Sequence, residues 1–467
     1  MNKFSFQSLV NLNIRKVFDW HKNTFALERL TPPWDLVNVS KRHYINSYPL
    51  INGGTIEIKQ KIFPLINLKW KLIHQEYSEY KKFTDLMLRG PFKFWRHEHI
   101  FQGNDLETNI IDQIEYKAHL SNDLLNSFIK RKLNKSFEYR HKILNRDLND
   151  KNFNQDDSKY VLIIGGSGLV GSHLIPLLNS LNYKIIQLKF SPNKSEELIT
   201  NDFHKLIWNP YTNNFPKIPK DISDKIKFAI NLSGENILGL ATKSKKKSIL
   251  ESRLKSTHSL KNFLIKNKIK LECAIHASAT GFYGDNSNVK NDENSKKGEG
   301  FLSDTTEEWE YYQNKFADIA DRVINLRIGA VISRKGGFLK NILLPYNLKL
   351  GIGINSNNYI SHISIEDLCR SISYLMKDSR IKGVVNAVSP SPIKLSDIFK
   401  EIKLIKKPIF NFNLPSKLIR KISDEISKEL IFSNQYILPC KLIESNFNFL
   451  HKTFGNSLSY EFGVDEK

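Results

Sequence analysis

Three glycines in one short stretch, Gly165, Gly168 and Gly171, have the spacing of a loop that holds a dinucleotide. The first glycine lets the chain turn sharply after a strand, and the second lets phosphates approach the backbone. The third lets the following helix pack closely on the strand, and the free N–H groups at the start of that helix attract an anion. Because an apolar strand-like run at 160–164 precedes the turn, the stretch predicts a dinucleotide site.

Hydroxyl groups suited to proton transfer follow a later strand-like run. We expect Ser278, Thr280 and Tyr283 to surround the reacting carbon, where Ser278 hydrogen-bonds a carbonyl and Tyr283 donates a proton. The alternative for Tyr283 is that its ring packs beneath the cofactor, and both interpretations stay open. Asp285 and Glu310 are further carboxylates that could partner this group.

The end of the second predicted strand bears on the choice of cofactor. An acidic residue there binds the ribose hydroxyls of NAD, whereas a basic residue accommodates the 2′-phosphate of NADP. The stretch 187–191 carries no acid, and Lys189 is basic. We therefore expect NADP, with NAD as the alternative.

Strand and helix patterns alternate through the C-terminal part of the chain. Strands are predicted at 160–164, 184–188, 226–231, 272–277, 323–327 and 384–387, and helices at 171–181, 243–266, 301–320, 337–349 and 365–377. This alternation predicts an α/β domain with a doubly wound parallel sheet of the Rossmann type. From residue 410 onward, short apolar segments predict an appended helical subdomain.

The N-terminal part, residues 1–145, has different patterns. The segments 56–60 and 68–72 alternate apolar and polar residues as half-buried strands do, and apolar residues at 120–133 have helical spacing. We expect an α+β domain in which a long helix closes a curved sheet. The polar, Asn/Asp-rich stretch 146–158 is interpreted as a linker.

Composition excludes several classes of function. The chain has 467 residues, a net charge of +22 and three cysteines that lie far apart. The lysines are scattered, and the run 245–247 is interpreted as the solvated face of a helix, so we expect no nucleic-acid partner. Neither a secretory signal nor a membrane span is evident, and the cysteine spacing suggests no disulfides. We therefore expect a cytoplasmic protein with a small-molecule substrate.

Two histidines raise the question of a metal. His97 and His99 stand two residues apart, but no carboxylate or cysteine occurs at a suitable spacing beside them. We therefore interpret them as structural and predict no metal site.

Several stretches together resemble a known family. The C-terminal part is similar to the atypical extended short-chain dehydrogenase/reductase branch of NAD-dependent epimerase/dehydratase-like proteins, usually called the epimerase family. The resemblance lies in GGSGLVG (165–171), NLSGENI (231–237), SR (252–253), SATGFYG (278–284), WE (309–310), LRIG (326–329), GG (336–337), NAVSP (386–390) and LPCKL (438–442). It implies a cofactor-binding Rossmann domain at 159–409 and the family's C-terminal subdomain at 410–463.

The glycine turn and the resemblance together define the expected cofactor contacts. These are Gly165, Ser167, Gly168, Leu169, Val170, Gly171, Lys189, Leu232, Ser233, Gly234, Arg253 and Val331. The family commonly has a Ser-Arg pair where this chain has Lys189 and Phe190, so the arginine is missing and the charge has moved by one position. Arg253 is a candidate phosphate partner, and the alternative is an arginine on a helix surface.

The usual catalytic dyad of these enzymes is predicted to be absent. Tyr311 and Lys315 have the Tyr-x-x-x-Lys spacing in which a lysine lowers the pKa of a catalytic tyrosine. Aligned with the family on Ser278, however, the usual tyrosine falls near Phe301 and the usual lysine near Thr305. A tyrosine and a lysine four residues apart are common by chance in a chain rich in both.

The N-terminal part has a resemblance of its own. VFDWH (17–21), RLTPPW (29–34), FTD (83–85), GPF (90–92), WRH (95–97) and FEYRH (137–141) are similar to the polyketide-cyclase/START-like (SRPBCC) helix-grip domain. That fold encloses an apolar cavity, so the resemblance implies a hydrophobic ligand. The alternative is that the tryptophans of this region fill a small core.

Three functions remain open at this stage. The first is an NADP-dependent oxidoreductase or epimerase-like enzyme acting on an unidentified substrate. The second is a cofactor-binding regulator without turnover, because the predicted nucleotide site is intact whereas the usual acid/base pair is predicted to be absent. The resemblance also permits a role in cell or plastid division, to which relatives in the family are linked. The third is a lipid-binding carrier in which the Rossmann domain is structural.

Overall fold

The computed structural model describes residues 1–44, 50–63, 66–120, 122–151, 153, 159–191, 198–212, 215–237, 241–285, 289–422 and 424–465. The chain forms two compact units. The first comprises Met1–Asp157, Ile175–Ile185 and Leu198–His204, and the second comprises Ser158–Leu174, Ile186–Glu197 and Lys205–Lys467.

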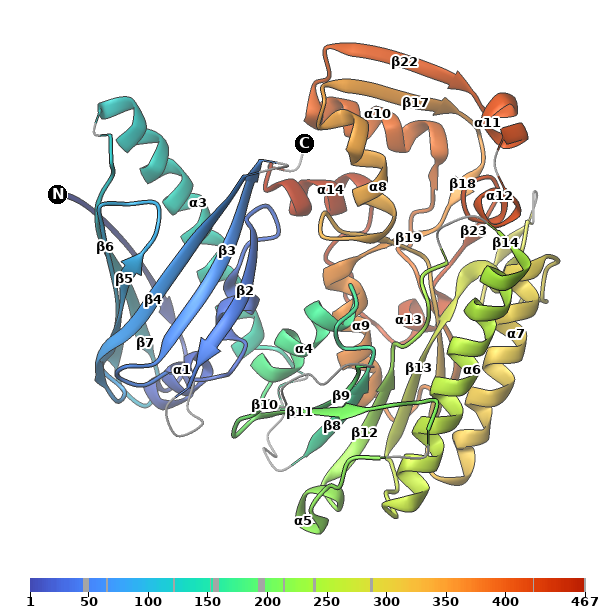
Figure 1. Cartoon of the computed structure of the whole chain (residues 1–467), viewed down its shortest axis with the longest axis horizontal. Helices are drawn as coiled ribbons and strands as arrows, with labels where there is room; N and C mark the ends of the chain where they lie inside the picture. The colour runs from blue at the N-terminus through green and yellow to red at the C-terminus, as the bar shows by residue number, and fades with distance from the viewer. Residues whose placement is uncertain are drawn as a thin grey trace. The chain divides into compact units, whose positions relative to one another are not determined.

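An antiparallel sheet of seven strands forms most of the first unit, in the order β1-β7-β6-β5-β4-β3-β2 (Figure 1). The strands are β1 Asn2–Val10, β2 Leu36–His43, β3 Thr55–Phe63, β4 Ile66–Ser78, β5 Lys82–Arg89, β6 Phe94–Gly103 and β7 Thr108–Lys117. The predicted strands at 56–60 and 68–72 lie within β3 and β4 and are confirmed. Their polar residues alternate with apolar ones because successive side chains point to opposite faces.

A long helix, α3, accompanies this sheet, together with α1 (Ile14–His21) and α2 (Ala26–Leu30). Figure 1 shows α3 running along one face of the sheet, and Phe137 of α3 packs on Phe4 with ring centroids 5.5 Å apart. The helix spans Asp123–Leu148, so it continues far beyond the predicted 120–133. Residues 146–148 of the predicted linker are therefore helical. The cause is tertiary, because Asp147 is buried in an ion pair with Arg29 at 2.7 Å.

Carboxylates lie beside His97 and His99 after all. In the register of the sheet, Asp85 of β5 stands directly opposite His97, and Asp112 of β7 stands directly opposite His99. The prediction that no carboxylate is suitably placed is therefore wrong. It failed because the partners come from neighbouring strands and not from the local sequence.

A second sheet has eight strands in the order β10-β11-β9-β8-β12-β13-β15-β20. The strands are β8 Tyr160–Ile164, β9 Lys184–Phe190, β10 Leu198–Ile199, β11 Phe203–Trp208, β12 Ile226–Asn231, β13 Cys273–Ala279, β15 Val323–Ile328 and β20 Gly383–Ala387. The pairs β8–β12, β12–β13, β13–β15 and β15–β20 are all parallel. All six predicted strands are present, and the parallel α/β architecture is confirmed.

Helices connect the strands of this sheet. They are α4 Gly171–Ser180, α5 Lys220–Ser223, α6 Lys243–Lys266, α7 Phe301–Asn314, α8 Gly337–Tyr346, α9 Ile365–Lys377 and α10 Leu395–Lys406. The ends of α6 and α9 agree with the prediction, because Thr242 and Ser364 cap their first turns with side-chain oxygens. The prediction for α7 was too long, since the chain tightens into a 3₁₀ turn at Lys315–Asp318.

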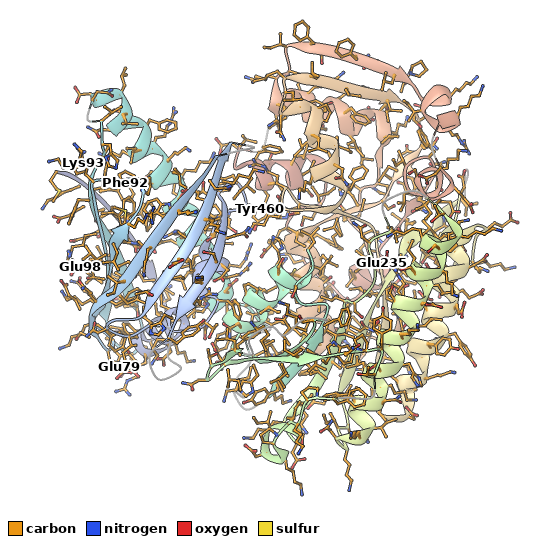
Figure 2. The ribbon with its side chains drawn as sticks, in the orientation of Figure 1. Glu79, Phe92, Lys93, Glu98, Glu235 and Tyr460 are labelled. Carbon is orange, nitrogen blue, oxygen red and sulfur yellow. The ribbon has the colours of Figure 1, made fainter. Side chains whose placement is uncertain are left out.

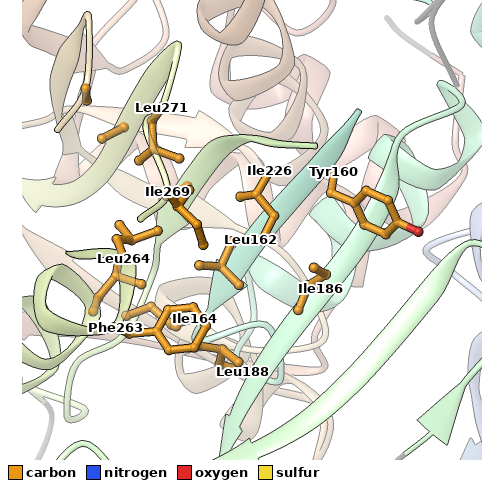
Figure 3. Close-up of a cluster of buried hydrophobic side chains, with 14 of the residues drawn as sticks. Tyr160, Leu162, Ile164, Ile186, Leu188, Ile226, Phe263, Leu264, Ile269 and Leu271 are labelled. Carbon is orange, nitrogen blue, oxygen red and sulfur yellow. The ribbon is translucent and has the colours of Figure 1, made fainter. Parts of the chain in front are cut away.

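The apolar core of the second unit lies between the sheet and α6. Figure 3 shows Leu162 and Ile164 of β8 close to Phe263 and Leu264 of α6, and all four side chains are buried. The continuous apolar run of β8 is typical of a parallel strand covered on both faces. This packing fixes β8, and with it the turn that follows.

The C-terminal part is less helical than predicted. It begins with strand β22 (Phe410–Pro415), which pairs in parallel with β17 (Leu350–Asn355). It continues through α11 Ser416–Ile422, α12 Glu425–Ile431, β23 Tyr436–Ile437, α13 Cys440–Glu444 and α14 Phe454–Phe462. The strand was missed because its backbone partner is distant in sequence. Within the described residues, no helix is both long enough and apolar enough to span a membrane.

Candidate active site

The glycine turn after β8 has the geometry that its sequence predicts. Gly165 has a φ of +77°, and a Cβ on it would lie 2.5 Å from the carbonyl carbon of Leu232. A Cβ on Gly171 would lie 2.4 Å from the Cα of Gly166. Both positions therefore exclude a side chain. The turn stands next to the loop that follows β12, at the point where the strand order reverses.

Gly168 differs from the other two glycines because the space beside it is open. Among the described residues beyond its two chain neighbours, the one atom within 4 Å of a Cβ there would be the carbonyl oxygen of Gly165, at 3.3 Å. The N–H of Gly168 donates to that same oxygen at 3.0 Å, which fixes the turn. Helix α4 begins at Gly171, so its free N–H groups lie at the turn. These residues fit the pyrophosphate of a dinucleotide.

The remaining residues of the turn are held by neighbouring elements. Ser167 Oγ accepts a hydrogen bond from Gln187 Nε2 of β9 at 3.1 Å. Leu169 lies near Gly336, where an added Cβ would approach its Cδ1 to 3.2 Å. Val331 belongs to the short strand Ala330–Ile332, whose partner is His362–Ser364. Lys189 is half-buried near the carboxyl end of β9.

The loop after β12 is fixed by the side chain of Asn231. Its Oδ1 accepts from the backbone N–H and the hydroxyl of Ser233, at 3.1 and 2.6 Å, and its Nδ2 donates to Thr257 at 3.1 Å. The Leu232 N–H donates to the carbonyl of Ile164 at 3.0 Å. The predicted contacts in this loop therefore lie beside the glycine turn.

Arg253 of α6 is half-buried, and its guanidinium contacts other protein groups. Its guanidinium lies over the ring of Trp309, 5.0 Å from the centroid, and donates to the carbonyls of Ile249 and Glu235 at 2.9 and 3.2 Å. Burial lowers its pKa to about 10. No carboxylate of the described residues forms an ion pair with it. The Glu235 carboxylate (labelled in Figure 2) bonds instead to Lys245 at 2.5 Å. A cation of this kind suits an anionic ligand.

Ser278 belongs to a buried network at the carboxyl end of β13. Its hydroxyl donates to Glu310 at 2.5 Å, and Glu310 accepts two hydrogen bonds at 2.8 Å from Arg327. Arg327 also donates to the Tyr283 hydroxyl at 3.0 Å, and that hydroxyl donates to Asn386 at 2.7 Å. Sequence reasoning named Glu310 only as a possible partner and missed Arg327 as its counter-ion. The signal was present in the motif LRIG, because β15 pairs with β13.

Tyr283 has the environment of a structural tyrosine. Its side chain is fully buried, and both hydrogen bonds of its hydroxyl go to protein groups. Burial raises its pKa to about 12. These observations favour packing over proton donation, the two alternatives left open by the sequence. Thr280 begins the 3₁₀ turn Thr280–Tyr283 and is also buried.

Tyr311 and Lys315 lie on the outer face of α7. Tyr311 is 62% exposed, and the ammonium group of Lys315 lies 4.6 Å from its ring centroid. The adjacent residue Glu310 points inward to Ser278, and successive helix residues do not share a face. The Tyr-x-x-x-Lys spacing therefore does not bring a tyrosine to Ser278.

Comparison with known proteins agrees with this geometry. A model of the NAD dependent epimerase/dehydratase family matches residues 161–317. An epimerase family protein of Mycobacterium bovis is 30% identical over 304 residues, which cover 64% of this chain and 96% of the relative. The chain belongs to the NAD-dependent epimerase/dehydratase family.

Further relatives extend the likeness of this epimerase-family chain. An epimerase family protein of Bacillus subtilis is 28% identical over 301 residues, covering 64% of this chain and 96% of the relative. The solved nucleoside-diphosphate sugar epimerase of Corynebacterium glutamicum is 25% identical with a TM-score of 0.72, covering 99% of this chain and 91% of that one. A human epimerase family protein solved with NADPH has 23% identity, a TM-score of 0.57 and coverage of 65% of this chain and 99% of that one. The latter likeness concerns the fold alone.

Proposed function

We propose that this chain is an NADP(H)-dependent oxidoreductase or epimerase-like enzyme of the short-chain dehydrogenase superfamily. The observation that carries the proposal is the open position beside Gly168, at a turn whose other glycines are too crowded for side chains. A dinucleotide bound there would supply hydride transfer at its nicotinamide.

Different residues are proposed to bind different parts of the cofactor. Gly168 and the start of α4 hold the pyrophosphate, and Lys189 faces the 2′-phosphate of NADP. Arg253, which is half-buried without a carboxylate partner among the described residues, supplies a further charge to an anionic ligand. The preference for NADP over NAD rests on Lys189, which is basic where an acidic residue would favour NAD.

The proposed reaction centre is Ser278 with Thr280. The Ser278 hydroxyl donates its hydrogen bond to Glu310, so its oxygen is left to accept a hydrogen bond from a hydroxyl group of the substrate. The paired hydrogen bonds from Arg327 hold the Glu310 carboxylate in position. Tyr283 positions Arg327 and does not donate a proton.

The proposed substrate class is the nucleoside diphosphate sugars. The Corynebacterium glutamicum protein, which matches almost the whole chain, is described as a nucleoside-diphosphate sugar epimerase. Such a substrate carries a diphosphate and hydroxylated carbons that can exchange a hydride. A panel of these sugars is therefore the first to assay.

Calorimetric titration with NADPH and NADH, at fixed salt, tests the cofactor assignment. We expect one site per chain and tighter binding of NADPH, because its extra phosphate meets Lys189. Failure of both cofactors to bind would contradict the proposal. Equal affinities would contradict the role of Lys189 alone.

A cofactor-binding regulator without turnover is the second candidate. The observation that favours it is that neither tyrosine is placed to transfer a proton beside Ser278. Tyr283 is fully buried, and Tyr311 is exposed on α7, away from the face that carries Glu310. Measuring nicotinamide oxidation and reduction with the sugar panel separates the two functions. If the chain turns over, Ser278→Ala should lower kcat by about 100-fold or more, and Tyr311→Phe should leave it unchanged. NADPH binding without any turnover would favour the regulator.

The START-like assignment of the first unit remains a proposal. The antiparallel sheet with α3 along one face supports a helix-grip fold. An apolar ligand or a lipid-carrier role has less support, because the sheet face toward α3 carries His97, His99 and Asp112 beside its apolar residues.

A further inference from the structure

The first unit contains a cluster of polar side chains that the cofactor site does not use. His97 and His99 lie two residues apart on β6, so both point to the same face of the sheet. Asp85 lies opposite His97 on β5, and Asp112 lies opposite His99 on β7. His97, His99 and Asp112 are all buried. The sheet thus brings two imidazoles and two carboxylates together at one place.

Three of these side chains have the spacing of a metal site. One donor atom each from Asp85, His97 and His99 lie within 4.8 Å of one another. Two of these atoms, His99 Nε2 and Asp85 Oδ2, lie 3.5 Å apart. Two ligands of a tetrahedral zinc ion are about 3.4 Å apart, since each Zn–N or Zn–O bond is about 2.1 Å. Side-chain movements of about 1 Å would bring the donor atoms to the spacing of zinc ligands.

Asp112 occupies the place of a supporting carboxylate. Its Oδ1 lies 2.7 Å from His97 Nε2 and 2.8 Å from His99 Nδ1, and its Oδ2 lies 2.7 Å from Nε2 of His141 on α3. A carboxylate only accepts hydrogen bonds, so the ring nitrogens that face Asp112 carry protons. The second nitrogen of His97 then keeps its lone pair, as in metal sites where a carboxylate orients a histidine. The second nitrogen of His99, Nε2, faces Asp85, so a metal bound between them would displace its proton.

The carboxylate ligand is supported in the same way. His74 Nδ1 of β4 lies 2.6 Å from Asp85 Oδ1, and the other oxygen of Asp85 faces His99. One oxygen of Asp85 is therefore held by the protein and the other is available. Structural histidines need only hydrogen-bond partners, whereas this cluster also places three possible donor atoms within 4.8 Å of one another.

We propose that Asp85, His97 and His99 bind a divalent transition metal of the zinc class, with Asp112 and His74 orienting the ligands. Imidazole nitrogens exclude Mg²⁺ and Ca²⁺, which prefer oxygen ligands. Three protein ligands leave a fourth position for water or for an oxygen atom of a ligand, which is the arrangement of an open site. The proposal is independent of the dinucleotide site.

Binding of Zn²⁺ and Co²⁺ to the chelator-treated full-length chain tests this proposal. We expect one Zn²⁺ per chain by metal analysis and calorimetry, and intense visible absorption with Co²⁺, because a tetrahedral site gives strong bands and a hydrated surface ion does not. Less than half an equivalent of Zn²⁺, or only the weak absorption of hydrated Co²⁺, would overturn the proposal. This readout needs no variant.

Variants locate the site. Asp85→Asn and His99→Gln should each weaken Zn²⁺ binding by at least about 100-fold, and Asp112→Asn by about 10- to 100-fold.

Glu98→Gln and His119→Gln are the matched controls. Glu98 lies between the two histidines but on the other face of β6 (labelled in Figure 2), and His119 is exposed. NADPH titration and circular dichroism of each variant check folding. Ligand variants that bind Zn²⁺ as tightly as the controls would contradict the assignment.

Discussion

Gly168 is the glycine of the turn at which a side chain would enter the proposed phosphate position. The position beside it is open in a turn that is otherwise crowded, so an added side chain would occupy the space proposed for the phosphates. At the same scale, Lys189 is the one basic residue of the 187–191 stretch, and we propose that it favours NADP over NAD.

Gly168→Asp should abolish NADPH binding, because its carboxylate would both fill the phosphate position and repel the phosphate charge. We expect affinity to fall by at least about 100-fold in calorimetric titration. Asn294→Asp adds the same charge to an exposed loop and should leave the affinity unchanged. If the Gly168→Asp variant binds NADPH as tightly as the wild-type protein, the phosphates do not bind at this turn.

Lys189→Asp should reverse the cofactor preference. An acidic residue at this place repels the 2′-phosphate and can accept hydrogen bonds from the ribose hydroxyls of NADH. We expect NADPH to bind about tenfold more weakly or worse, with NADH bound at least as well as before. Lys270→Asp is the control, since it makes the same charge change at 78% exposure before β13 begins. If both variants behave alike, Lys189 does not contact the 2′-phosphate.

At the scale of elements, α14 carries a buried acid whose protonation affects stability. Glu461 accepts a hydrogen bond from the backbone N–H of Arg334 at 2.6 Å, and its other oxygen has no hydrogen-bond partner. Burial raises its pKa from 4.5 to about 7. The folded chain therefore keeps a proton that the unfolded chain has lost between pH 4.5 and 7. The free energy of unfolding contributed by this group falls as pH rises through that window.

Glu461→Gln should remove this pH dependence. A pKa shift of this size corresponds to about 3 kcal/mol in the free energy of unfolding. Between pH 5 and pH 8 the wild-type protein should lose this contribution, and the variant should not. Denaturant unfolding of both proteins at the two pH values measures the difference. Parallel pH profiles would mean that Glu461 is ionised in the folded chain.

At the scale of the whole molecule, the net charge of +22 affects every anionic ligand. Lysines that cluster in sequence are neutralised locally, since Lys245 bonds to Glu235 and Lys246 to Glu425, both at 2.5 Å. The excess charge is therefore spread over the molecule. Such a charge attracts anions over long distances, and dissolved salt screens this attraction.

NADPH affinity should consequently fall with ionic strength, and more steeply than NADH affinity, because NADPH carries the extra phosphate. Between about 50 and 500 mM salt we expect roughly a tenfold loss for NADPH. Calorimetric titration with both cofactors at matched salt concentrations measures it. Identical slopes for the two cofactors would mean that no basic group contacts the 2′-phosphate.

The sequence by itself determined the strands, helices and glycine turn of the Rossmann-type sheet, because hydrophobic periodicity, caps and glycine spacing are local signals. Tertiary structure alone decided which distant side chains meet. It placed Arg253 over Trp309, joined Glu310 to Arg327, extended α3 through Asp147, and set carboxylates opposite His97 and His99. Strand register and helix packing produce these contacts, and sequence spacing does not record which strands become neighbours.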